Sequence, residues 1–184
     1  MVDIIGHLGM ALIWLAPAWL FIDGEKTAVT FVAVGFWFGL VPDIDLFLQR
    51  VFETIKHHGI LHTILAVSLI AVVVGPLVGW LLERALGGSD WFSPEAEDRA
   101  ASVGFLMVWI AGLAHIFADI LSAPDIAEAI EPFWPLYQQS VGIDLVWYNN
   151  PMFNWGLFIV GIGLNVALYY TKLKSNRSSV PEPQ

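Results

Sequence analysis

The sequence predicts an all-α protein, a polytopic bundle of about five transmembrane helices. Hydrophobic residues make up 57% of the 184 residues and charged residues only 14%, whereas about a quarter of the residues of a soluble domain are charged. Several apolar stretches also have about the length that a bilayer requires. Lipid as the solvent explains so much apolar surface better than one very large water-excluding core does.

Five apolar stretches are candidates for the transmembrane helices. They are Ile4–Ile22, Thr27–Val41, Ile60–Leu82, Ala100–Leu121 and Met152–Thr171. The first has no basic residue before it and is interrupted by His7, so we expect a retained helix rather than a cleaved signal peptide. The second is the shortest, and its end is marked by Pro42.

The connections between these stretches predict one membrane domain, residues 1–171, and a polar, disordered cytoplasmic tail, residues 172–184. The segment DGEK, residues 23–26, predicts a tight turn, and residues 87–99 predict an acidic solvated loop. The aromatic segment from Glu131 to Pro151 contains no basic residue, so we expect an interfacial lid. Glu128 and Glu131 are expected on a solvated face, and Trp134 is expected in the interfacial aromatic belt.

The basic residues predict the orientation, because cytoplasmic loops collect Lys and Arg. With the tail in the cytoplasm, five spans leave only Arg50 and Lys56 of the eight basic residues outside. We therefore expect a multi-pass plasma-membrane protein whose N-terminus lies on the extracytoplasmic face. The loops that precede the third and fifth spans lie on the same face.

The charge and the absence of cysteine exclude several functions. A net charge of -9 argues against nucleic acid and anionic lipid as electrostatic partners. Without cysteine, the chain has no disulfide, no thiolate nucleophile and no cysteine-type zinc site.

Ionisable side chains at the ends of the apolar stretches indicate a functional site. A charge at a helix centre costs about 2.5–3.5 kcal/mol on an insertion scale, so such residues are rare unless they have a partner. They come from four separate segments: His7, Asp43, Asp45, His57, His58, His62, His115 and Asp119. All of them fall at the outer membrane surface in the orientation above, which was derived from Lys and Arg alone.

The spacing of these residues favours a metal site. His115 and Asp119 are four residues apart and share one helix face, and His58 and His62 do so if the third helix begins early. Imidazole and carboxylate without thiolate are the ligands of catalytic zinc, or of manganese or iron at higher coordination. Each motif alone has a plainer explanation, such as a hydrogen-bonded core histidine for His7. Their occurrence at one membrane depth favours the metal.

Four blocks carry a family resemblance. They are GHLGMAL at 6–12, GLVPDID at 39–45, HHGILHT at 57–63 and AGLAHIFADILSAPDI at 111–126. In this order they resemble the sequence blocks of the LexA-regulated, membrane-bound metal-dependent hydrolase family, also called YdjM-like. The chain departs from that pattern at two positions: Leu46 stands where the family has a histidine, and His58 where it has an arginine.

The resemblance implies a membrane hydrolase distantly similar to zinc-dependent phospholipase C. It also implies a cofactor of one or two divalent ions, zinc or manganese. The implied metal ligands are His7, Asp45, His57, His62, His115 and Asp119, with Asp119 as a candidate bridge between two ions.

We therefore expect hydrolysis of a phosphoester, a membrane lipid or a lipid-linked phosphate, at the extracytoplasmic face. Asp43 is expected to act as a general base or to support a ligand, and His58 to contact or protonate the leaving group. Two alternatives remain: a haem-binding membrane protein, which the nearby carboxylates disfavour, and a metal or proton transporter. A transporter needs a path to both faces, and the other halves of the spans lack matching polar residues.

Overall fold

The computed structural model describes residues 2–52, 54–122, 128–143 and 145–178, and in these residues it confirms the predicted all-α fold. The elements are α1 (Ile4–Leu15), α2 (Ala18–Phe21), α3 (Glu25–Gly35), η1 (Phe36–Leu40), α4 (Ile44–Leu48), η2 (Ile60–His62), α5 (Ile64–Leu86), α6 (Pro94–Glu97), α7 (Ala100–Leu121) and α8 (Pro151–Ser178), where η marks a 3₁₀ helix. The only strand-like pairing among the described residues is an isolated bridge between Ser122 and Val146.

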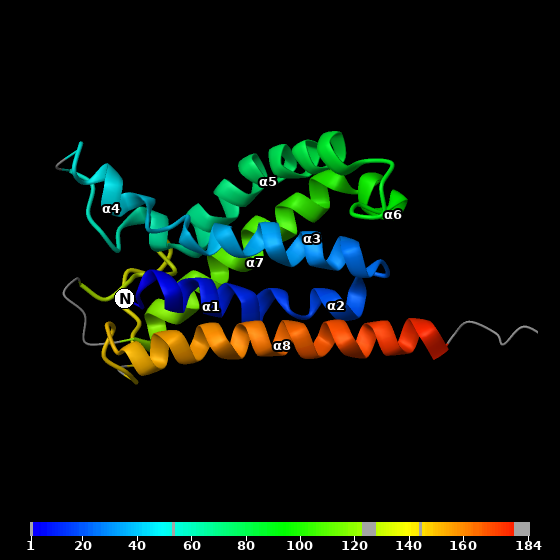
Figure 1. Cartoon of the computed structure of the whole chain (residues 1–184). Helices are drawn as coiled ribbons and strands as arrows, with labels where there is room; N and C mark the ends of the chain where they lie inside the picture. The colour runs from blue at the N-terminus through cyan, green and yellow to red at the C-terminus, as the bar shows by residue number, and fades with distance from the viewer. Residues whose placement is uncertain (1, 53, 123–127, 144, 179–184) are drawn as a thin grey trace, which may run out of the picture.

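Four segments are long and apolar enough to cross a membrane: Ile4–Phe21, which comprises α1 and α2, then α5, α7, and α8 up to Ser175. The remaining predicted span, residues 27–41, is short, as expected. It consists of the 11-residue α3 and the 5-residue η1, which together cover about 26 Å at the usual rise per residue. The described residues thus form four long segments and the short second one, and α3 runs back alongside α1 (Figure 1).

The helix α7 lies at the centre of the bundle, in contact with α1, α3, η1 and α5, while α8 packs mainly against α1 (Figure 1). Small residues allow the closest of these contacts. A Cβ at Gly104 of α7 would overlap the backbone of Gly75 and Gly79 of α5, so the two helices touch backbone to backbone. Such small-residue contacts are typical of helix pairs in membranes.

The outer helices present apolar side chains to the surroundings. Those more than a third exposed on α5 and α8 include Leu69, Val72, Val73, Leu77, Trp80, Trp155, Ile159 and Val160. In water such a surface would be costly, and in lipid it is the expected exterior.

The helix α8 continues beyond the predicted end of the membrane domain, to Ser178. Lys172 Nζ donates hydrogen bonds to the main-chain oxygens of Trp19 and Ile22, at the end of α2. This contact anchors the start of the segment that was predicted to be disordered, so that prediction is wrong for residues 172–178. Residues 179–184 lie outside the described part of the chain.

The two ends of the bundle differ. One end carries the start of α1, the projecting α4, the start of α5 and the segment before α8; the other carries the α2–α3 turn, α6 and the end of α8 (Figure 1). The ionisable residues singled out above gather at the first end.

Candidate metal centre

Four separate segments place histidines and aspartates at one end of the bundle. His7 lies in the first turns of α1, after the N-cap Asp3, whose carboxylate accepts a hydrogen bond from Gly6 N. Asp43 and Asp45 follow Pro42 where η1 gives way to α4, and His62 ends η2. His115 and Asp119 lie in the last turns of α7. Apart from Asp43, these six side chains are at most 5% exposed.

Four of the side chains form a central cluster, defined here as Asp43, His62, His115 and Asp119. The Nε2 atoms of His62 and His115 lie 3.1 Å apart, and each lies 3.1–3.5 Å from Asp43 Oδ1 and Asp119 Oδ2. Ligand atoms about 2.1 Å from a tetrahedral zinc ion are about 3.4 Å from one another. The central cluster therefore has the atom separations of a set of ligands around one ion.

His7 lies beside this cluster, on the far side of its two carboxylates. His7 Nε2 is 3.4 Å from Asp119 Oδ1 and 3.9 Å from Asp43 Oδ2. Its ring stacks on that of His115, with centroids 3.7 Å apart and planes at 11°. Each carboxylate thus turns one oxygen toward the central cluster and the other toward His7. His7 Nε2, Asp119 Oδ1 and Asp43 Oδ2 could therefore bind a second ion, and the two carboxylates would bridge it to an ion in the central cluster.

A backbone carbonyl orients His115. Nδ1 of His115 lies 2.7 Å from the Gly39 carbonyl oxygen, which can only accept, so Nδ1 carries the hydrogen and Nε2 presents its lone pair to the cluster. Such hydrogen bonds behind a ring are typical of histidine metal ligands. Gly39 can lie this close to α1 because it has no side chain. A Cβ at this position would lie only 2.8 Å from the Ala11 side chain.

Asp45 lies behind two imidazole rings rather than inside the central cluster. Its Oδ1 is 2.8 Å from His57 Nδ1, and its Oδ2 is 3.1 Å from His62 Nδ1. The angles of the second contact are not those of a hydrogen bond, since both atoms lack a hydrogen-bond partner. Asp43, Asp45, His57 and His62 also offer ligand atoms within 4.8 Å of one another, so the donors extend beyond the central cluster.

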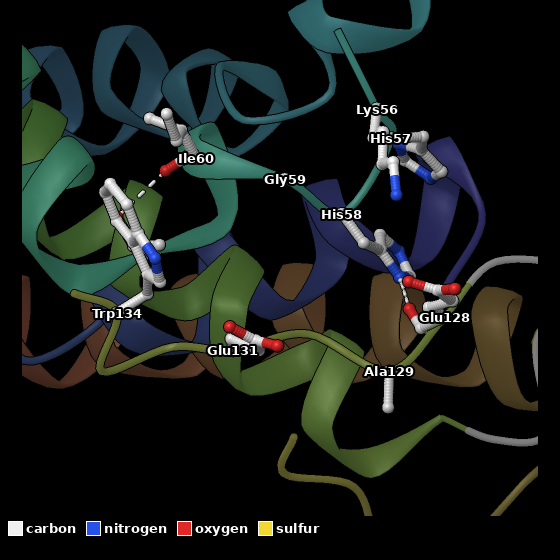
Figure 2. A pocket seen from close by; sticks show the side chains of 10 residues that line it. Lys56, His57, His58, Gly59, Ile60, Glu128, Ala129, Glu131 and Trp134 are labelled. Atoms are coloured by element: carbon white, nitrogen blue, oxygen red, sulfur yellow. Dashed lines mark hydrogen bonds between the residues drawn. The ribbon is translucent and has the colours of Figure 1, made fainter. Parts of the chain in front are cut away.

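His58 joins the site from a loop and not from a helix. The condition under which His58 and His62 would share a helix face is not met, because α5 begins only at Ile64, where the Thr63 side chain caps it. His58 has φ +61°, a conformation uncommon for residues with a side chain. Its Nδ1 donates to the Glu128 carbonyl oxygen over 2.7 Å, as Figure 2 shows. Its ring centroid lies 4.9 Å from that of His62.

Burial and charge act on the protonation of the groups outside the spans. Burial disfavours the imidazolium of His62, but Asp43, Asp45 and Asp119 outweigh burial and raise the pKa of His62 to about 9. Burial opposes ionisation of Asp43 and Asp45 as well, yet their histidine partners hold the pKa of both carboxyls below the usual range. Burial lowers the pKa of His58. The carboxylates are therefore ionised at neutral pH and His58 is neutral.

Unpartnered buried atoms test whether the site fits a cation. In the described part of the chain, buried side-chain atoms without a hydrogen-bond partner include both ring nitrogens of His7, Asp43 Oδ1, Asp45 Oδ2, His62 Nδ1 and Asp119 Oδ2. Each such atom costs about 1–3 kcal/mol. Of these, Asp43 Oδ1, Asp119 Oδ2 and His7 Nε2 face the positions described above, and a divalent cation would satisfy them. Nitrogen and carboxylate donors suit zinc, or manganese at higher coordination.

The fold and the site define a class: a helical membrane protein with buried histidine and aspartate groups that could hold a metal ion. The chain belongs to the YdjM inner membrane protein family, whose model matches residues 1–180. The predicted membership of the YdjM-like family is thereby confirmed. No curated protein and no solved structure is significantly similar to this chain.

The structure brings together all eight residues selected from the sequence, but in different positions. Asp43, expected as a base, lies in the central cluster, while Asp45 and His57, expected as ligands, lie behind or beside it. The carbonyls of Gly39 and Glu128 were not selected. Gly39 lies in the GLVPDID block, so the sequence offered a signal for it. No sequence feature indicated the Glu128 carbonyl. Residues 123–126 of the last block lie outside the described residues.

Proposed function

We propose that this protein is a metal-dependent hydrolase of a phosphoester, a lipid or lipid-linked phosphate, at the extracytoplasmic face of the membrane. One observation carries the proposal: the central cluster and His7 bring three imidazoles and two carboxylates from distant segments together, with buried atoms that lack partners. A buried site of this composition is costly to build and is explained by a cation.

The residues would divide the work as follows. A bound divalent ion supplies Lewis-acid activation of water and of a phosphoryl oxygen. Asp43, His62, His115 and Asp119 hold it, and Asp45 orients the ring of His62. His58 is neutral and donates through Nδ1 to Glu128, so Nε2 is its acceptor nitrogen. We therefore assign His58 as a proton acceptor from water rather than as the acid for the leaving group.

The surroundings of the site support a lipid substrate. The segment that contains α4 projects from the bundle (Figure 1) and exposes Ile44, Phe47, Val51 and Phe52. A cavity of 390 Å³, lined largely by apolar side chains of residues 48–61, adjoins Asp45. This cavity could take an acyl chain while the phosphate lies at the metal centre.

The haem alternative has little support in this geometry. The rings of His7 and His115 stack directly, and the Nε2 atoms of His62 and His115 are 3.1 Å apart. Neither pair leaves space for a porphyrin between the two imidazoles.

The test is hydrolysis by purified protein. Protein stripped of metal and reloaded with zinc or manganese should release product from a lipid phosphoester. The double variant His115→Ala and Asp119→Ala should lose turnover and bound metal but keep its helical circular dichroism. Asp23→Ala, in the exposed turn at the other end, is the matched control.

Turnover retained by the double variant would refute the proposal. Metal flux across proteoliposomes without any hydrolysis would instead favour the transporter alternative.

A further inference from the structure

A second cavity adjoins the metal centre on its polar side. It has a volume of 320 Å³ and lies between two walls (Figure 2). One wall is the loop before α5, from Lys56 to Thr63, and the other is the segment from Glu128 to Trp134. His57 and His58 belong to this cavity and also to a possible metal-binding group with His62. A molecule in the cavity would therefore reach the metal centre.

The two walls carry opposite charge. Lys56 and the two histidines line one wall, whereas the carboxylate side chains of Glu128 and Glu131 line the other (Figure 2). Within the residues that the structure describes, Lys56 Nζ and the Glu131 carboxylate make no hydrogen bond or ion pair. Glu128 is exposed and Glu131 is half-buried, so the expected solvated face holds for Glu128 and only in part for Glu131.

An aromatic side chain stands next to the acidic wall. Trp134 lines the cavity three residues after Glu131, and it is also only half-exposed. An indole ring and a carboxylate that line the same cavity are a favourable environment for an organic cation, because the ring face and the carboxylate both attract positive charge. A tryptophan of the interfacial belt, the role predicted for Trp134, would not need to line this cavity.

We propose that this cavity binds the headgroup of a phosphoester that carries a positively charged amine, such as phosphoethanolamine. The phosphate lies toward Lys56, His57 and the metal centre, and the ammonium lies against Glu131 and Trp134. This inference rests on the proposed function for the role of the metal centre and adds the class of substrate.

The charges of the cavity disfavour other phosphoesters. A headgroup with hydroxyl groups alone leaves the carboxylate of Glu131 without a cation, and a headgroup with a second phosphate meets two carboxylates of like sign. One charge-assisted hydrogen bond is enough to favour the amine about tenfold.

The test measures binding, so that its result does not depend on turnover. Calorimetric titration of the metal-loaded protein should show about tenfold tighter binding of O-phosphoethanolamine than of glycerol 1-phosphate. Glu131→Gln should remove this preference, so that the two compounds bind with equal affinity. Trp134→Leu should reduce the preference. Glu95→Gln, on the exposed surface of α6 at the other end, is the matched control and should keep it.

Nanodiscs distinguish a lipid from a soluble phosphoester as the source of this headgroup. Tighter association with phosphatidylethanolamine than with phosphatidylglycerol identifies a lipid as the substrate. A preference for the soluble amine alone identifies a water-soluble substrate. Both results support a phosphoester with a positively charged amine as the substrate class.

Equal affinities of the wild type for the two soluble compounds would overturn the inference, as would an unchanged preference in Glu131→Gln. Hydrolysis without a binding preference for the amine would refute only this inference. A binding preference for the amine without hydrolysis would refute only the proposed function.

Discussion

Asp45 contacts two imidazoles at once, through Oδ1 to His57 and through Oδ2 to His62. Because it lies behind the ring of His62, we expect Asp45 to set the direction of Nε2 rather than to hold the ion. Asp45→Asn should lower metal affinity about 10–100-fold, the usual effect of removing a group that orients a ligand. Competition with a chromogenic chelator measures this loss.

Asp43→Asn is the comparison for that prediction, since Asp43 Oδ1 lies in the central cluster itself. Its loss of affinity should be larger than that of Asp45→Asn. The reverse order would mean that Asp45, as the family resemblance implied, holds the ion directly.

The proton on His62 makes metal binding depend on pH. In the metal-free protein the pKa of His62 is raised from 6.5 to about 9, so at neutral pH an ion must displace this proton. Apparent affinity should rise about tenfold per pH unit from pH 7 to 9 and then level off. Asp43 and Asp45, whose pKa values are lowered, add no slope in this range. Metal titrations at several pH values, with proton release in weak buffer, check this.

An affinity that stays constant between pH 7 and 9 would show that His62 is neutral before the ion binds. The same linkage acts on the metal-free fold. The stabilisation that protonated His62 provides is complete below about pH 6.5 and is lost as the pH rises through 9.

At the scale of elements, the contact between α5 and α7 positions the ligands of the site relative to one another. His115 and Asp119 lie in α7, and His62 lies just before α5. Gly104→Val should separate the two helices and destabilise the protein by about 1–3 kcal/mol. The reason is that a side chain at Gly104 meets the backbone of Gly75 and Gly79. Thermal melting in detergent, together with metal content, measures the effect.

Gly163→Val in α8 is the matched control, since a Cβ at Gly163 meets no atom within 4 Å. This variant should melt as the wild type does. Equal melting of both variants would show that the close α5–α7 contact contributes little.

The short segment of α3 and η1 has a local role as well. Its tight last turns end at Leu40 and bring the Gly39 carbonyl against His115. In a regular α-helix that carbonyl would accept a hydrogen bond from the backbone amide four residues later instead of from His115. The departure from regular α-helix therefore supplies an acceptor that the site uses.

At the scale of the whole molecule, the orientation can be tested with cysteine, because the 184 residues contain none. Ser140→Cys lies in an exposed stretch before α8, and Ser89→Cys lies in the exposed connection between α5 and α6. The distribution of Lys and Arg predicts that a membrane-impermeant maleimide labels Ser140→Cys in intact cells. It should label Ser89→Cys only after the cells are permeabilised. The opposite pattern would place the metal centre in the cytoplasm.

Much of the fold and of the site could be predicted from the sequence, because lipid restricts what the chain can do. Long apolar runs predicted α5, α7 and α8, and the cost of burying His7 and Asp119 marked them as part of a site. The exchange of roles between Asp43 and Asp45 could not be predicted, since both follow Pro42 and the direction of each side chain depends on tertiary contacts. The start of α5 was misplaced because Ile60 and Leu61 of the 3₁₀ turn before it continue the apolar run of the helix in the sequence.

The order of the ligands along the chain has a consequence for biogenesis. His7 leaves the ribosome first, whereas Asp119, which faces it in the folded protein, arrives near the end of α7, the third of the four long segments. No ion can be captured by the complete set until the translocon has released α7. If the protein binds metal as proposed, loading is a late step, and the ion comes from the compartment that this end of the bundle faces.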